Sequence, residues 1–131
     1  MLEWKTRITQ LKEVAAGVGL SYGHTWHTQR PSLIATLPVG YGDGLHRNLS
    51  NRMQVLVSGT RCPQVGRITM DQSLVDVTEL RGRVSLGDEA VLIGKQGQET
   101  IHADELAGLL GTINYEIVSA ITQRVPRIVV T

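Results

Sequence analysis

The sequence has 131 residues, the length of one domain, and its 13 Lys and Arg residues nearly balance 12 Asp and Glu residues. Bulk charge therefore gives no signal for a nucleic-acid or membrane-surface partner, and no apolar run approaches the roughly 18 residues of a membrane-spanning helix. The single cysteine, Cys62, excludes an intrachain disulfide, so we expect a cytoplasmic protein.

Up to Thr100 the chain predicts short β-strands separated by turns that contain glycine or proline. Apolar and polar residues alternate imperfectly over residues 2–14, which favours one long strand. Ser58-Gly59-Thr60 separates two β runs and predicts a hairpin. The expected strands are residues 2–14, 32–37, 53–57, 61–65, 74–78 and 89–94.

The pattern becomes helical after Thr100. Apolar residues follow near-helical spacing from Ile101 to Leu110, Gly111 is a plausible helix end, and a second helix is expected to follow. Residues 124–130 predict a final apolar strand. The expected fold is mainly β: a closed or partly open antiparallel β-barrel-like domain with two short helices near the C-terminus.

Three glycine-containing strings stand out: Gly19–Trp26, Pro38–Gly44 and Gly66–Gln72. Glycines on both sides of Tyr22 let another surface approach its phenol closely. For the first string alone, the simpler interpretation is a turn between two strands, with Tyr22 half buried.

Residue types alone predict no catalytic centre. The four histidines and Cys62 lack metal-ligand spacing, so we expect no metal site. Asp43 and Asp71 are the best candidate acids, but Asp43 stands between two glycines, where a turn-forming role is more common than acid–base chemistry.

Together with Gly111–Glu116 and Arg124–Arg127, the three strings resemble the C-terminal β domain of alanine racemases, which are pyridoxal-phosphate enzymes. The resemblance runs from about residue 2 to residue 127. It implies that residues 1–131 are this domain and that an N-terminal barrel, which covalently holds the pyridoxal 5′-phosphate, is absent from the chain.

The resemblance implies that L- and D-alanine are interconverted as an external aldimine with the cofactor, by two bases on opposite faces. One base is a lysine of the barrel, and the other, delivered by the partner subunit of a head-to-tail homodimer, matches Tyr22. A phenol with a pKa near 10 is a poor base at neutral pH. The resemblance places the histidine that assists it in the absent domain, so His24 is not expected to do so.

Further roles are implied by the same resemblance. Tyr41 and Met70 match substrate-binding residues, and Tyr115 matches a tyrosine that binds the cofactor phosphate. The corridor that leads to the site matches Arg47, Arg67, Asp71 and Ile113. Without the motifs, Met70 and Ile113 would be interpreted as ordinary core residues. Differences from the family at Leu45, His46 and Thr69 leave the range of substrates open.

We therefore expect the C-terminal domain of a racemase that supplies D-alanine for peptidoglycan. It should be inactive alone, because Lys5, Lys12 and Lys95 do not lie in a barrel-strand context. Its expected partners are its own N-terminal barrel, a second subunit and a small amino acid. Two alternatives remain: a racemase of serine or of a broader range of amino acids, and a non-catalytic β domain for dimerisation or binding.

Overall fold

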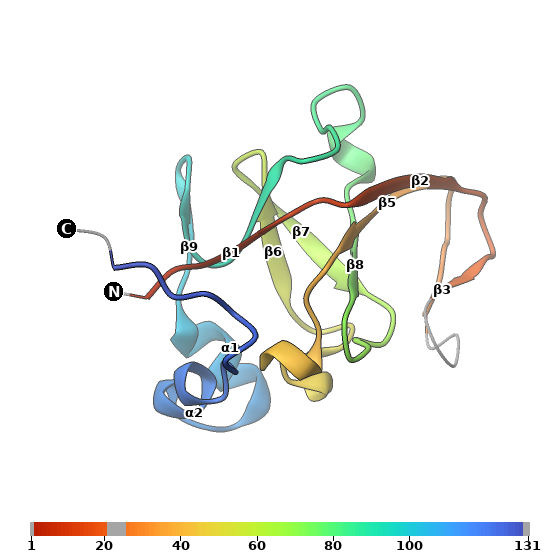
Figure 1. Ribbon diagram of the computed structural model, residues 1–131. Helices are drawn as coiled ribbons and strands as arrows, with labels where there is room; N and C mark the ends of the chain where they lie inside the picture. The colour runs from red at the N-terminus through yellow and green to blue at the C-terminus, as the bar shows by residue number, and fades with distance from the viewer. Residues whose placement is uncertain (1, 21–25, 130–131) are drawn as a thin grey trace.

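An antiparallel sheet of eight strands is the main element of the computed structural model, which describes residues 2–20 and 26–129 (Figure 1). Seven strands follow one another in the order β1-β9-β6-β7-β8-β5-β2, and β10 pairs with β9. The strands are β1 (Trp4–Arg7), β2 (Gln10–Val14), β5 (Ser32–Leu37), β6 (Gln54–Val57), β7 (Thr60–Val65), β8 (Ser73–Asp76), β9 (Glu89–Gln96) and β10 (Glu99–Ile101). A separate two-stranded ribbon consists of β3 (Gly19–Leu20) and β4 (Trp26–His27).

The N-terminal segment joins the two ends of this sheet. Strand β1 pairs with β9, whereas β2, only two residues further on, pairs with β5. At the change of partner, the Ile8 N–H donates to the Asp88 carbonyl at 2.9 Å and the Thr9 N–H donates to the Thr36 carbonyl at 3.0 Å. The described parts of β1 and β2 do not pair with each other, so the sheet is curled but not closed. This is the partly open form of the predicted fold. The predicted single strand over residues 2–14 is wrong, since it divides where its partner changes.

The predicted hairpin is formed by β6 and β7, and its turn is one residue shorter than the predicted Ser58-Gly59-Thr60, since Thr60 belongs to β7. Ser58 and Gly59 both have positive φ angles, 52° and 71°, and Val57 pairs with Thr60 across the turn. Positive φ at both turn positions gives the backbone twist that matches paired strands. The hairpin prediction is therefore confirmed.

The main hydrophobic core fills the inside of the curled sheet. Its central members alternate along the strands and include Ala35, Leu37, Val55, Val57, Val75, Ala90 and Leu92. Because successive side chains of a strand point to opposite faces, Ile34 belongs to a second, outer cluster. The β3–β4 ribbon covers this outer cluster through Leu20 and Trp26. The chain contains no Phe, and branched aliphatic side chains take its place in the core.

Two short helices lie at one end of the sheet, beside the 3₁₀ helices η2 (Tyr41–Asp43) and η3 (Arg47–Leu49) (Figure 1). They are α1 (Ala103–Leu110) and α2 (Asn114–Ser119), as predicted, and α1 ends at Gly111 with a φ of 71°. A third 3₁₀ helix, η4, spans Thr78–Leu80. In the described ranges, no helix has both the length and the apolar character that a membrane crossing requires.

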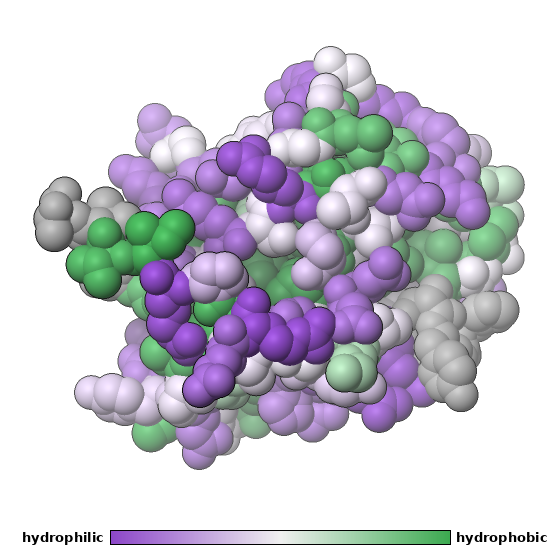
Figure 2. Space-filling view, in the orientation of Figure 1, coloured by the Kyte–Doolittle hydropathy of each residue, from purple (hydrophilic) through white to green (hydrophobic). Residues whose placement is uncertain are grey.

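The predicted strand over residues 124–130 is wrong for its described part. Residues 124–129 contain no strand. Loop contacts hold this segment and the residues just before it: the Thr122 N–H donates to the Asp43 carbonyl at 3.0 Å, and Arg127 Nη2 donates to the Ile121 carbonyl at 2.8 Å. Beyond them, Ile128 and Val129 are exposed. Figure 2 shows a hydrophobic projection at the left, on the side where the C-terminus lies in Figure 1.

The buried thiol of Cys62 provides a test of core burial. Only 4% of the Cys62 surface is exposed, and burial, reinforced by the negative charge of Asp76, raises the pKa of the thiol from 9.0 to about 11. Between these two pKa values the unfolded chain binds fewer protons than the folded chain. The free energy of unfolding should therefore fall as the pH rises from 9 to 11.

We expect this fall to be about 2 kcal/mol larger for the wild type than for a Cys62→Ala variant, since one pKa unit corresponds to about 1.4 kcal/mol. Urea unfolding of both chains at several pH values measures it. The tyrosines and lysines are common to both chains, so their ionisation cancels in the difference. Parallel pH profiles would show that the thiol ionises normally in the folded protein.

Candidate functional site

Two of the glycine-containing strings meet at the helical end of the sheet. The Tyr41 loop (residues 40–44) lies against the Met70 loop (residues 66–72). The N–H groups of Tyr41 and Gly42 donate to the carbonyls of Thr69 and Met70, each at 2.9 Å. The structure therefore brings Tyr41 and Met70 together from separate parts of the sequence.

Glycine is required for this close contact. A Cβ atom on Gly40 would lie 2.1 Å from the Thr69 carbonyl oxygen, and a Cβ atom on Gly44 would lie 2.4 Å from that of Ala120. Gly44 also has a φ of 107°, a backbone angle that residues with a Cβ atom rarely adopt. On this second side, the Thr122 hydroxyl donates to the Gly42 carbonyl at 2.9 Å. The Tyr41 loop is thus held between the Met70 loop and the segment that follows α2.

Three charged side chains join the same segments. Asp43 is buried, and its Oδ2 accepts a hydrogen bond from the Gly40 N–H at 2.9 Å, which agrees with the turn-forming role expected for it. Its Oδ1 lies 3.3 Å from Arg124 Nε, and Arg124 Nη2 binds Asp71. The hydrogen bond to Asp71 raises the pKa of Arg124. The role of Arg124 could not be predicted from the sequence, because its spacing from the two aspartates follows no local pattern.

Four of the predicted site residues expose much of their surface. The exposed fractions are 47% for Tyr41, 51% for Met70, 63% for Ile113 and 77% for Tyr115. The alternative that Met70 and Ile113 are core residues is therefore wrong. Ile113 precedes α2 and Tyr115 lies in its first turn, so both occupy the same end of the sheet as Tyr41. Several large exposed side chains at one end of a domain indicate a contact surface.

The two predicted corridor arginines lie on neighbouring segments. Arg47 is the first residue of η3 and is exposed, while Arg67 is partly buried in the Met70 loop. The residues on either side of Arg67 donate their N–H groups to Asn51 Oδ1 and Ser50 Oγ, at 2.6 and 2.8 Å. These acceptors directly follow η3, so side-chain hydrogen bonds fix the two segments to each other.

Tyr22 lies outside the described residues, as does His24. The ribbon that flanks them is well anchored: Leu20 pairs with Trp26, and the buried Thr28 hydroxyl donates to the Ala15 carbonyl at 2.6 Å. The first glycine-containing string therefore connects two antiparallel strands whose base is hydrogen-bonded to the segment after β2.

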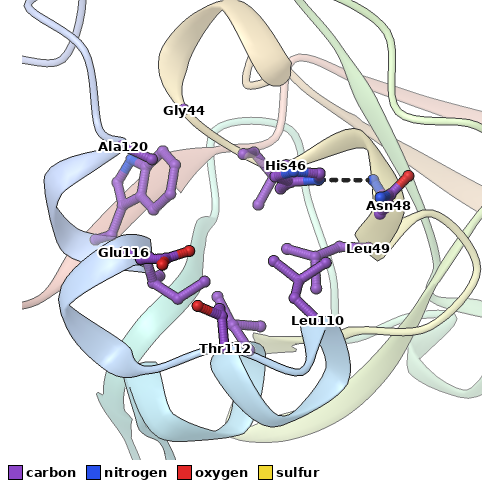
Figure 3. Close-up of a pocket in the computed structure, with 12 residues that line it drawn as sticks. Gly44, His46, Asn48, Leu49, Leu110, Thr112, Glu116 and Ala120 are labelled. Atoms are coloured by element: carbon purple, nitrogen blue, oxygen red, sulfur yellow. Dashed lines mark hydrogen bonds between the residues drawn. The ribbon is translucent and has the colours of Figure 1, made fainter.

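A hollow near these residues lies between η3 and the two helices. It has a volume of about 240 Å³, and the His46 ring and the Glu116 carboxylate lie on opposite sides of it (Figure 3). His46 Nδ1 accepts a hydrogen bond from the Asn48 N–H at 3.1 Å. A hollow of about 470 Å³ lies beside β2 and β3. No described residue of the predicted site lines either hollow; these residues form an open surface.

A comparison with known families identifies the family of the chain. The family model described as "Alanine racemase, C-terminal domain" matches residues 1–129. The chain belongs to the alanine racemase C-terminal domain family. An alanine racemase from Halothermothrix orenii is 58% identical over 127 residues, which are 97% of this chain and 33% of that protein.

Solved structures agree with the family and confirm the predicted fold class. The crystal structure of alanine racemase from Bacillus anthracis with bound L-Ala-P is 44% identical and gives a TM-score of 0.92 over 98% of this chain and 32% of that one. Alanine racemase from Bartonella henselae with covalently bound pyridoxal phosphate is 33% identical, with a TM-score of 0.89 over 96% and 34% of the two chains. The chain thus spans about a third of the length of its relatives.

The described residues could form one part of a site for the cofactor. They do not form the whole site. Lys5 lies 3.2 Å from Glu3 and 3.9 Å from Glu89 on the sheet, and Lys12 and Lys95 are exposed on β2 and β9. None of these lysines belongs to the Tyr41 or Met70 loop. The exposed Tyr115 hydroxyl can donate a hydrogen bond to a phosphate group. Within the described residues, no group of three His, Cys, Asp or Glu side chains could hold a metal ion.

Proposed function

We propose that residues 1–131 are the C-terminal domain of a longer alanine racemase that interconverts L- and D-alanine. The observation that carries this proposal is the 58% identity to an alanine racemase over nearly the whole chain, with Tyr41 and Met70 together on an exposed surface. The longer protein would include a barrel domain that holds pyridoxal phosphate. It would supply D-alanine for peptidoglycan in the cytoplasm, where Cys62 stays reduced.

The proposed chemistry divides the work between domains. Pyridoxal phosphate, when bound, withdraws electrons and so makes the Cα proton of an amino acid removable. Tyr22 would accept or return this proton on one face, and a barrel lysine would do so on the other. A phenol with an ordinary pKa near 10 must pass its proton to a neighbouring group to act as a base at neutral pH. That neighbour would belong to the barrel.

The exposed surface would bind and select the substrate. Tyr41 and Met70 would orient the amino-acid carboxylate, and Tyr115 would donate a hydrogen bond to the cofactor phosphate. The corridor would be lined by Arg47, Arg67, Asp71 and Ile113. Phenol rings around a narrow passage admit a methyl side chain more readily than larger ones.

We propose that the remaining walls come from the barrel and from the partner subunit of a head-to-tail homodimer. This accounts for the large exposed side chains, because exposed apolar residues of this size are common at interfaces. A full-length protein that is monomeric in solution and fully active would contradict this division of the site.

The isolated 131-residue chain with pyridoxal phosphate should not racemise alanine, whereas the full-length protein should. Chiral chromatography of the products from L-alanine, D-alanine and L-serine measures both results. Equal or faster turnover of serine by the full-length protein would favour the broader racemase. No turnover of either amino acid would favour a domain for dimerisation or binding.

A further inference from the structure

Arg124 connects the Tyr41 loop to the Met70 loop. Its Nε lies 3.3 Å from Asp43 Oδ1, and its Nη2 binds Asp71 Oδ1. Its Nη1 lies so close to the backbone of Gly42 that a Cβ atom there would be 2.1 Å away. One guanidinium group therefore fills the space between the two loops and pairs with a carboxylate from each.

This arrangement differs from an ordinary exposed ion pair, which contributes little to stability. The Asp43 side chain is only 11% exposed, and its other oxygen holds the Gly40 N–H. Removal of Arg124 would leave a buried carboxylate without its charge partner, a state that proteins tolerate poorly. Asp43 would then have to move toward water, and the loop that carries Tyr41 would move with it.

We propose that Arg124 is a positioning residue that keeps Tyr41 and Met70 at a fixed separation. The inference rests on the proposed function, since it is the racemase substrate that would lie against these two side chains. Arg124 acts through the two aspartates and does not touch the substrate. Its planar, forked guanidinium can pair with both aspartates at once, whereas a lysine ammonium is a single point charge.

Amide hydrogen exchange in the full-length protein tests the structural part of the proposal. The reporters are the N–H groups of Tyr41 and Gly42, which donate to the Thr69 and Met70 carbonyls. We expect Arg124→Ala to accelerate their exchange by about 10-fold or more, because local opening becomes easier. The Ile8 N–H, which bonds to Asp88 in another part of the sheet, should be unchanged.

Arg81→Ala is the matched control. Arg81 also makes two hydrogen bonds to a carboxylate, at 2.8 and 2.7 Å, but to Glu13 of β2. This variant should leave the exchange at Tyr41 and Gly42 and the racemase activity unchanged. Unaltered exchange at Tyr41 and Gly42 in Arg124→Ala would overturn the proposal, whatever the activity of that variant.

Steady-state kinetics test the functional part. Arg124→Ala should lower kcat/KM for alanine by about 100-fold, the loss typical of a small misplacement of groups that contact the substrate. Arg124→Lys should recover only a minor part of the lost kcat/KM. Added guanidinium ion, at concentrations well below denaturing, should partly rescue Arg124→Ala but have no effect on Arg81→Ala.

Loss of position and loss of charge compensation can be separated. Without Arg124, Asp71 adds an uncompensated negative charge to the corridor, so a second substitution, Asp71→Asn, removes that charge. If positioning is the cause, the double variant stays as slow as Arg124→Ala. Full recovery would overturn the proposal in favour of a purely electrostatic role. A wild-type protein without racemase activity would refute the proposed function, and the exchange comparison would still decide the role of Arg124.

Discussion

A Tyr22→Phe substitution in the full-length protein should abolish Cα proton exchange with D₂O mainly from one enantiomer of alanine. Loss of a positioned base typically slows a proton transfer by roughly 10²–10⁴-fold. The lysine on the opposite face would still remove the proton of the other enantiomer, so exchange from that enantiomer should persist. Proton NMR of L- and D-alanine incubated separately with the enzyme and pyridoxal phosphate measures both rates.

Tyr41→Phe is the contrasting variant. It removes a hydroxyl from the proposed substrate-binding surface and leaves the proposed base in place. We expect it to change KM and to affect both enantiomers to a similar extent. If exchange from both enantiomers survives Tyr22→Phe unchanged, Tyr22 is a gate or a packing residue and the two-base assignment fails.

Gly44→Ala should be among the most damaging single substitutions in the Tyr41 loop. Its Cβ atom would lie 2.4 Å from the Ala120 carbonyl oxygen and 2.6 Å from the Ile121 Cα, at a φ of 107°. The unfavourable backbone angle costs about 1–2 kcal/mol and overpacking about 1–3 kcal/mol, so we expect a loss of about 2–5 kcal/mol. Urea unfolding of the 131-residue chain measures it.

Two further alanine variants separate the causes. Gly82 has a φ of 82° but no atom within 4 Å of its Cβ position. Gly82→Ala should therefore lose only the stability that corresponds to the unfavourable backbone angle. Gly40 has an ordinary φ of −150°, but its Cβ position is 2.1 Å from the Thr69 carbonyl oxygen. Gly40→Ala should therefore lose only the stability that corresponds to overpacking. If Gly44→Ala and Gly82→Ala lose equal stability, the close contact with Ala120 does not stabilise the loop.

Local patterns in the sequence were sufficient to predict most of the elements. The hairpin was predicted because Ser58-Gly59-Thr60 separates two β runs, and Gly111 marked the end of α1 because glycine readily adopts a positive φ. The division of the N-terminal strand after Arg7 could not be predicted. It depends on which distant strands pair with each half, and alternation of side chains contains no information about partners.

The candidate site was predictable only in part. The resemblance pointed to Tyr41, Met70 and Tyr115, whereas residue type alone would have placed Met70 in the core. The link from Arg124 to Asp71 spans 53 residues, and no spacing rule connects positions so far apart. The contacts of Gly40 and Gly44 likewise depend on the tertiary fold. Glycine itself indicated only that some close approach was possible.

The N-terminal segment has a consequence for the order in which the domain is made. Trp4 pairs with Ile93, so the first strand leaves the ribosome 89 residues before its partner. At typical rates of synthesis this corresponds to a delay of roughly 4–18 s. Throughout that time, any sheet already formed from β5 to β8 has at least one end without its neighbour, and unpaired strand edges promote aggregation. A nascent chain that stops before β9 therefore cannot complete its sheet.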